Sequence, residues 1–166
     1  YVVMVKNRLP GREFPGQLYR SSDGAASWQP VSLPEGVDFP NDLTIDPSGR
    51  LYLACWPRRV GDENFGGGAY ASDDGGRTWL RSADPGLHVY TVSVDAADPA
   101  KLYLGTFDAA LLRSTDRGQT WKALPGFDFQ WGYRPVPDPH HPGMLYMTTF
   151  GCSVWYGPAD GAEPAA

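Results

Sequence analysis

The chain has 166 residues, the size of one ordinary domain, and 42% of them are hydrophobic. The net charge is −5 with no basic run, which argues against a nucleic acid or an anionic membrane as partner, and the longest apolar runs are too short to span a bilayer. The first residue is Tyr1 rather than Met and no signal peptide is recognisable, so we expect the chain to begin inside a longer protein.

Short apolar runs rich in β-branched and aromatic residues recur along the chain and predict strands. The first is 1–6 (YVVMVK), and equivalents follow at 51–56 (LYLACW), 102–107 (LYLGTF) and 145–150 (LYMTTF). Their tyrosines stand 51, 51 and 43 residues apart, and an Asp-containing turn precedes each of the last three. No stretch has a helical period over a useful length. The sequence therefore predicts an all-β protein.

An eight-residue window with the pattern S-x-D-x-G-x-T-W keeps the same rhythm. It is complete at 72–79 and 114–121, and at 21–28 it has Ala25 in place of the glycine and Ser27 in place of the threonine. In a hairpin turn the Asp can accept hydrogen bonds from backbone N–H groups one or two residues further on, and glycine tolerates a positive φ. We therefore expect a distorted turn at Ala25. The residues that we assign this structural role are Ser21, Asp23, Trp28, Ser72, Asp74, Gly76, Thr78, Trp79, Ser114, Asp116, Gly118, Thr120 and Trp121.

Two markers that share one period indicate repeated units of four strands. In the third unit we expect strands at 91–95, 102–107 and 109–114, and a fourth that begins at Trp121, whose ring would fill the space between neighbouring units. Four-stranded antiparallel units of this length are typical of the blades of a β-propeller. We predict about three and a half blades, a partial ring, at 1–34, 41–83, 89–125 and 132–157, followed by a C-terminal tail at 158–166.

The window resembles the Asp-box, or bacterial neuraminidase repeat. This repeat occurs in sialidases, in xyloglucan-cleaving glycoside hydrolases, in the sortilin ectodomain and in a photosystem assembly factor. The strand rhythm of 92–121 resembles the last three groups more than sialidases proper, whose Tyr-Arg-Ile-Pro motif is incomplete at Tyr133. The resemblance covers almost the whole chain. It implies a β-propeller with its ligand on the face opposite the boxes, in an extracellular or periplasmic protein.

Loops on the opposite face are the predicted location of a binding site. The first two units have longer loops there, at 6–17 and 57–68: 27 residues separate Tyr52 from Trp79, against 18 between Tyr103 and Trp121. Polar groups beside exposed aromatic rings suit a sugar, so the candidate ligand-binding residues are Asn41, Arg58, Arg59, His88, Tyr90, Trp131, Tyr133 and Arg134. A glycosidase needs two carboxylates that flank the scissile bond, and the candidates are Asp38, Asp42, Asp62, Glu63 and Asp128, each of which could instead be a solvated loop carboxylate.

Two functions remain open from the sequence. The first is a carbohydrate-active, glycosyl-hydrolase-like module, and the alternative is a non-catalytic protein-binding scaffold of the sortilin or photosystem-assembly type. We leave open whether the whole protein is an enzyme and expect this chain alone to be inactive, because a central site draws on further blades. We expect those blades to come from a missing N-terminal part of the same chain, in preference to a second copy.

Neither a cofactor nor a metal is expected. His140 and His141 read as a surface turn because a metal site needs further convergent ligands. Cys55 and Cys152 are far apart and show no metal-ligand spacing, so we expect two free thiols.

Overall fold

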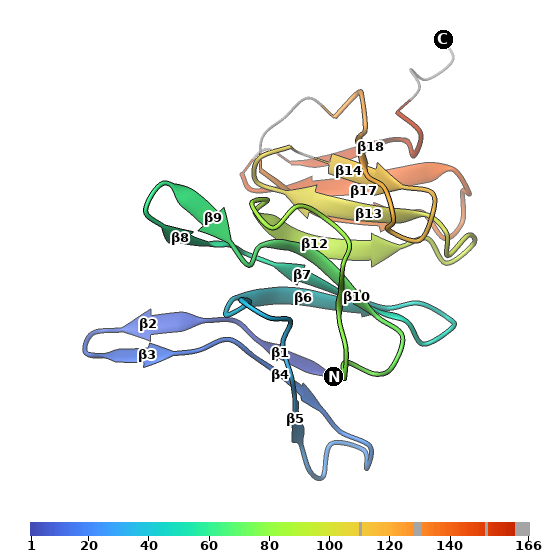
Figure 1. Cartoon of the computed structure of the whole chain (residues 1–166). Helices are drawn as coiled ribbons and strands as arrows, with labels where there is room; N and C mark the ends of the chain where they lie inside the picture. The colour runs from blue at the N-terminus through green and yellow to red at the C-terminus, as the bar shows by residue number, and fades with distance from the viewer. Residues whose placement is uncertain (110, 128–130, 152, 162–166) are drawn as a thin grey trace.

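The computed structural model describes residues 1–109, 111–127, 131–151 and 153–161. All regular elements within these ranges are β-strands, and none of the described segments forms a helix long and apolar enough to cross a membrane. Four antiparallel sheets follow one another along the chain and lie side by side, from blue to red in Figure 1. The predicted all-β class is confirmed.

The sheets share one strand order. The first sheet contains β1 (Val2–Met4), β4 (Gln17–Arg20) and β5 (Gln29–Val31). The second contains β6 (Pro40–Ile45), β7 (Leu51–Cys55), β10 (Gly68–Ser72) and β11 (Leu80–Arg81). The third contains β12 (Val89–Val94), β13 (Leu102–Thr106), β14 (Leu111–Ser114) and β15 (Lys122–Ala123). The fourth contains β16 (Gly132–Pro137), β17 (Met144–Thr149) and β18 (Val154–Pro158).

Two small hairpins extend the first and second sheets at the same end (Figure 1). They are β2 (Asn7–Leu9) with β3 (Arg12–Phe14), and β8 (Arg58–Val60) with β9 (Glu63–Phe65). Our sequence analysis treated both segments as loops. Gly11 and Gly61 have φ of 74° and 62°, so each can take the positive-φ position of a two-residue turn. The Pro-Gly pair before β3 was a local signal for this hairpin.

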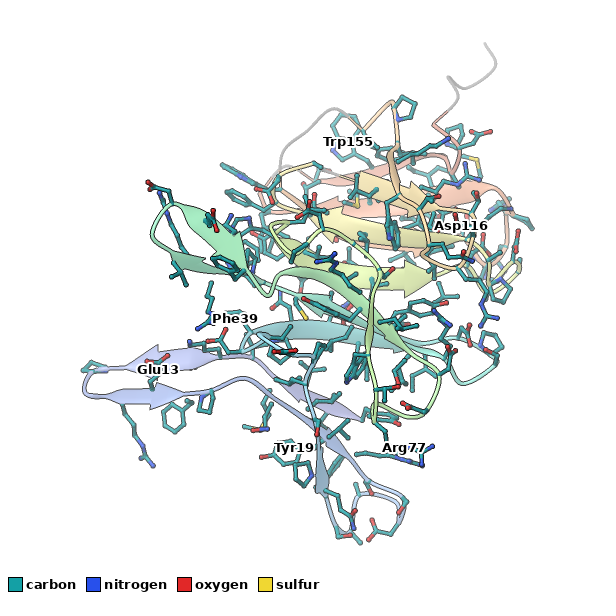
Figure 2. The ribbon with its side chains drawn as sticks, viewed as in Figure 1. Glu13, Tyr19, Phe39, Arg77, Asp116 and Trp155 are labelled. Carbon is teal, nitrogen blue, oxygen red and sulfur yellow. The ribbon has the colours of Figure 1, made fainter. Side chains whose placement is uncertain are left out.

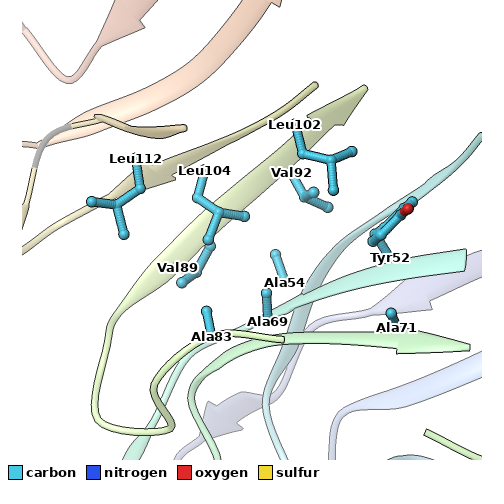
Figure 3. Packing of buried hydrophobic residues seen from close by; sticks show 10 residues of the cluster. All are labelled: Tyr52, Ala54, Ala69, Ala71, Ala83, Val89, Val92, Leu102, Leu104 and Leu112. Carbon is cyan, nitrogen blue, oxygen red and sulfur yellow. The ribbon is translucent and has the colours of Figure 1, made fainter. Parts of the chain in front are cut away.

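The largest core cluster lies between the second and third sheets (Figure 3). The second sheet contributes mostly small side chains, among them Ala54, Ala69 and Ala71, and the third contributes larger ones such as Leu102 and Leu104. Small residues that face large ones let the two sheets approach closely without voids. Because both faces of β7, β10 and β13 are covered, every residue of these strands is buried. Burial of each Leu side chain contributes about 1.5–3 kcal/mol.

The windows at 21–28, 72–79 and 114–121, which we call the Ser-Asp hairpins, share one hydrogen-bond network. Ser72 Oγ donates to Asp74 Oδ1 at 2.8 Å, and Asp74 Oδ1 accepts from the N–H groups of Arg77 and Thr78 at 2.9 Å each. The carboxylate therefore bonds groups three and four residues on, and our expectation of one or two was wrong. The cause is the pair of left-handed residues between them; in this hairpin the second is Gly76, with φ of 90°.

Ala25 keeps most of the network in the first Ser-Asp hairpin, so the distortion that we expected is limited to the bond that Arg77 N and Gln119 N donate to the carboxylate in the other two hairpins. Its N–H donates to Ser21 Oγ at 2.9 Å, and Ser27 N donates to Asp23 Oδ1 at 2.9 Å. Ala25 adopts φ of 70°, which costs a residue with a Cβ about 1–2 kcal/mol. Its side chain is exposed, whereas a Cβ at the equivalent Gly76 would lie 2.4 Å from Val31 Cγ1 of the first sheet.

Tryptophans at the ends of the Ser-Asp hairpins join neighbouring sheets. Trp79 Nε1 donates at 2.8 Å to the carbonyl oxygen of Ser32, the residue that follows the last strand of the first sheet. Trp121 Nε1 donates at 2.9 Å to the carbonyl oxygen of Ser82, which follows the last strand of the second sheet. Trp28 stands at the corresponding position of the first sheet and is 42% exposed. Two of the three tryptophans therefore have equivalent surroundings within this chain.

We expect the chain to lose stability as the pH falls from about 4 to 2. Hydrogen bonds from Thr120 and Ser114 lower the pKa of Asp116 to about 2, and those from Ser27 and Ser21 lower the pKa of Asp23 to about 2. An unfolded Asp has a pKa of about 3.9, so the stabilisation is complete above that pH and is lost as the pH falls through the folded value. Urea unfolding midpoints across this range test it, with Asp116→Asn expected to flatten the dependence. A midpoint constant down to about pH 2 would contradict the prediction.

Candidate aromatic ligand-binding site

One end of the four sheets carries most of the predicted site residues, and we call this end the rim. The two small hairpins project from it, and because the strands are antiparallel the Ser-Asp hairpins lie at the other end. Figures 1 and 2 show this separation, with Phe39 near the small hairpins and Asp116 at the far side. The site can therefore be described from the loops and strand ends at the rim.

The same backbone hydrogen bond recurs in the second, third and fourth sheets, and in each sheet it places two side chains at the rim. In each case the residue after the sheet's second strand donates to a residue just before its first strand. The three bonds are Trp56 N to Phe39 O (2.9 Å), Phe107 N to His88 O (2.9 Å) and Phe150 N to Trp131 O (3.3 Å). Five of these six side chains are aromatic hydrocarbons or indoles, and the sixth is the imidazole of His88.

Five of these six rings, all except Phe39, form with Tyr90 and Tyr133 an array that extends across three sheets, which we call the aromatic array. Its members are Trp56, His88, Tyr90, Phe107, Trp131, Tyr133 and Phe150. Trp56 contacts His88 and Tyr90 with ring centroids 4.6 and 4.8 Å apart, and Tyr90 contacts Phe150 at 4.8 Å. Trp131 stacks on Phe107 at 6.0 Å with an angle of 20° between the ring planes. Edge-to-face and offset contacts of this kind contribute about 0.5–1.5 kcal/mol per aromatic pair beyond area burial.

A pocket of about 420 Å³ opens within the aromatic array. Its walls combine aromatic faces with the polar side chains of Asn41 and Arg134, and its lining residues are Val5, Phe39, Asn41, Trp56, Tyr90, Thr91, Tyr133, Arg134 and Phe150. Apolar walls with a few polar groups are typical of small-ligand sites. Four predicted ligand-binding residues meet here: Asn41, Tyr90, Tyr133 and Arg134. His88 and Trp131 adjoin them through the ring contacts of the array.

Asp42 is neutralised by an ion pair between sheets. Its Oδ1 lies 3.1 Å from Arg134 Nη2, and its Oδ2 accepts a hydrogen bond from Val92 N at 3.2 Å. The Asp42 side chain is 17% exposed and that of Arg134 is 40% exposed. Asp42 thus fixes the guanidinium at the edge of the pocket, where it can donate to ligand oxygens.

Asp38 is also paired with a cation. Lys6 Nζ lies 2.8 Å from Asp38 Oδ2 and 2.8 Å from Glu13 Oε1, which ties the first small hairpin to the approach of β6. Hydrogen bonds to Asp38 and then to Glu13 raise the pKa of Lys6. Asp38 and Asp42 therefore each engage a positive side chain.

The second small hairpin holds the other charged candidates away from the pocket. Arg58, Arg59, Asp62 and Glu63 are all exposed on β8 and β9 or their turn, and Arg59 Nη2 pairs with Asp62 Oδ1 at 3.2 Å. None of these four lines the pocket as the structure describes it. Asp128, the fifth carboxylate candidate, lies outside the described residues, as does Cys152.

No protein-family model matches the sequence. The xyloglucanase Xgh74A of Acetivibrio thermocellus is 30% identical over 184 residues, an alignment that covers 88% of this chain and 20% of the relative. The solved GH74 xyloglucanase from Xanthomonas campestris has a TM-score of 0.67 at 18% identity and covers 91% of this chain and 26% of its own. A structure of YCF48 bound to D1 peptide has a TM-score of 0.56 at 18% identity, with 80% and 40% covered. The chain spans about a fifth of the length of the curated relatives it matches.

Stacked antiparallel sheets with a common strand order, and structural likeness to GH74 and YCF48 propellers, decide the fold. The chain is part of a β-propeller. The four sheets are its blades in chain order, the second and third with four strands and the first and fourth with three in the described chain. The predicted partial propeller is confirmed.

Sequence reasoning missed several rim residues of the propeller, although a signal for them was present. The residue four positions after the tyrosine of each second-strand run is Val5, Trp56, Phe107 or Phe150, and all four positions lie at the rim. A residue at the same register in every blade must reach the same end of the propeller. Asp108, which follows Phe107, was also missed, and it binds His88.

Proposed function

We propose that this chain is a carbohydrate-binding propeller module of a secreted, glycosyl-hydrolase-like protein, with its ligand at the rim. The observation that carries the proposal is the aromatic array, which is partly exposed and contains a pocket with a guanidinium at its edge. Sugar rings present C–H groups on their faces and hydroxyls at their edges, which matches aromatic faces beside Arg134 and Asn41. The sequence relatives are xyloglucanases, so a xyloglucan chain is the ligand that we propose first.

The carboxylates favour binding over catalysis in this part of the protein. A glycosidase acid must hold a proton and its partner must face the substrate, whereas Asp38 and Asp42 each bind a cation. We propose that catalysis, if the whole protein performs it, uses residues of blades beyond this chain. The exposed Trp28, whose counterparts Trp79 and Trp121 bond to a preceding blade, supports a further blade at that face. We expect it to come from the same protein rather than from a second copy.

A peptide-binding scaffold is the second candidate function. It is favoured by the structural likeness to YCF48 bound to D1 peptide and by an aromatic rim whose acidic side chains at the pocket are already paired. A titration that offers both a saccharide and an unrelated extended peptide separates the two functions.

Calorimetric titration of the chain with a xyloglucan oligosaccharide tests the proposal. We expect saturable binding and a loss of affinity of at least about tenfold in Trp56→Ala, because this ring contacts three others of the array. Trp28→Ala is the matched control. Trp28 lies on the Ser-Asp hairpin of the first blade, away from the rim, so this variant should bind the oligosaccharide with unchanged affinity. Equal affinities in both variants, or binding of the peptide alone, would overturn the carbohydrate proposal.

A further inference from the structure

One of three equivalent positions at the rim differs chemically from the others. The repeated backbone hydrogen bond aligns Phe39, His88 and Trp131 as its acceptors. The residue after each donor is Pro57 in the second blade, Asp108 in the third and Gly151 in the fourth. Two blades therefore form this corner with a large apolar ring and no neighbouring side-chain acceptor. The fold has no need for the His88 and Asp108 pair, so a role in binding is the better explanation.

The Asp108 carboxylate holds the His88 ring in one orientation. Asp108 Oδ2 accepts from His88 N at 2.8 Å and lies 2.9 Å from His88 Nδ1, and Oδ1 lies 3.2 Å from the same nitrogen. The imidazole is also packed against Trp56, with centroids 4.6 Å apart at 70°, and against Phe107 at 5.9 Å. Its side chain retains 21% exposure.

This geometry decides which ring nitrogen carries the proton. A carboxylate can only accept a hydrogen bond, so the nitrogen that faces it, Nδ1, must donate. In the neutral imidazole the other nitrogen, Nε2, then has a free lone pair and accepts. Among the residues of the aromatic array, the neutral imidazole alone offers such a ring-nitrogen acceptor; Trp56 and Trp131 carry only a donor N–H.

We propose that His88 Nε2 accepts a hydrogen bond from a hydroxyl of the saccharide that lies on Trp56 and Phe107, and that Asp108 is the positioning residue that sets this tautomer. The inference rests on the proposed function and adds one specific polar contact to it. A ligand hydroxyl can donate to Nε2, and other hydroxyls of the same ligand can accept from Arg134 or Asn41, which line the pocket beside Trp56 and Tyr90. The site thereby distinguishes a polyhydroxylated ligand from an apolar one of the same shape.

Nitrogen NMR of the imidazole tests the positioning role without any ligand. We expect the neutral imidazole of His88 in the full chain to carry its proton on Nδ1. Asp108→Leu removes both acceptor oxygens, so we expect the imidazole of that variant to lose its preference for the proton on Nδ1. An Nε2-protonated ring in the unmodified chain, or no change in Asp108→Leu, would overturn the assignment.

Titration with the xyloglucan oligosaccharide tests the acceptor role. His88→Phe places in the third blade the ring that Phe39 supplies in the second, so we expect an unchanged unfolding temperature. Affinity should fall about three- to tenfold, the effect of one lost hydrogen bond, and Asp108→Leu should show a similar fall. Unchanged affinity in His88→Phe together with weakened binding in Trp56→Ala overturns the acceptor role alone. Absence of binding by the unmodified chain overturns the proposed function as well.

Discussion

Replacing Gly105 by alanine should destabilise the chain by about 2–3 kcal/mol, because the new methyl group would overpack the contact between the third and fourth blades. Gly105 lies on β13, and a Cβ there would stand 2.0 Å from Tyr133 O and 3.0 Å from Thr91 Oγ1. The obstacle is backbone of β16, which no rotamer change can move aside. The two strands would have to separate by about 1 Å or more, which forfeits van der Waals contact along the interface.

Urea unfolding followed by tryptophan fluorescence measures this loss, and Gly157→Ala is the matched control. Gly157 lies on β18, where a Cβ would meet, among the residues that the structure describes, only Phe127 Cζ at 3.8 Å, an ordinary contact. Both substitutions restrict the unfolded chain equally, so the control should be unchanged or more stable by up to about 1 kcal/mol. If the two variants unfolded at the same urea concentration, the close approach of β13 and β16 would be wrong.

Truncating Trp121 to alanine should cost about 3 kcal/mol of stability. The indole packs on the core cluster between the second and third blades, and its Nε1 donates to Ser82 O at 2.9 Å. The truncation would remove buried apolar area and leave the Ser82 carbonyl without this donor. Trp121→Phe separates the two contributions, because it restores most of the packing and none of the hydrogen bond.

Trp28→Ala is the control for this prediction. Trp28 occupies the same register of its Ser-Asp hairpin but is 42% exposed, so its removal should change the free energy of unfolding by less than about 1 kcal/mol. Equal losses of unfolding free energy in Trp28→Ala and Trp121→Ala would contradict the role assigned to Trp121, which is to stabilise the contact between the second and third blades.

Much of the fold was predictable because two independent markers share one period. The tyrosine of each second strand and the tryptophan of each Ser-Asp hairpin recur together, and a repeated register requires a repeated sheet. The position of Trp56, Phe107 and Phe150 at one rim follows from the same register. The small hairpins were less visible, since β3 and β9 are exposed throughout and lack the alternation of a half-buried strand.

The polar part of the site could not be derived from the sequence. The partner of Asp42 is Arg134, two blades further along the chain, and their contact depends on how far successive blades turn against one another. Asp38 is likewise bound by Lys6 from the first blade. Both looked like free loop carboxylates in the sequence because charge pairing between distant segments leaves no local pattern.

Backbone amide NMR of the chain during titration with a xyloglucan oligosaccharide tests ligand binding at the rim most directly. We predict saturable shift changes at Trp56, Tyr90, Tyr133 and their neighbours in the aromatic array, and none at Asp74 and Asp116 in the Ser-Asp hairpins. Changes centred on the Ser-Asp hairpins, or no saturable change at any residue, would contradict the proposed function.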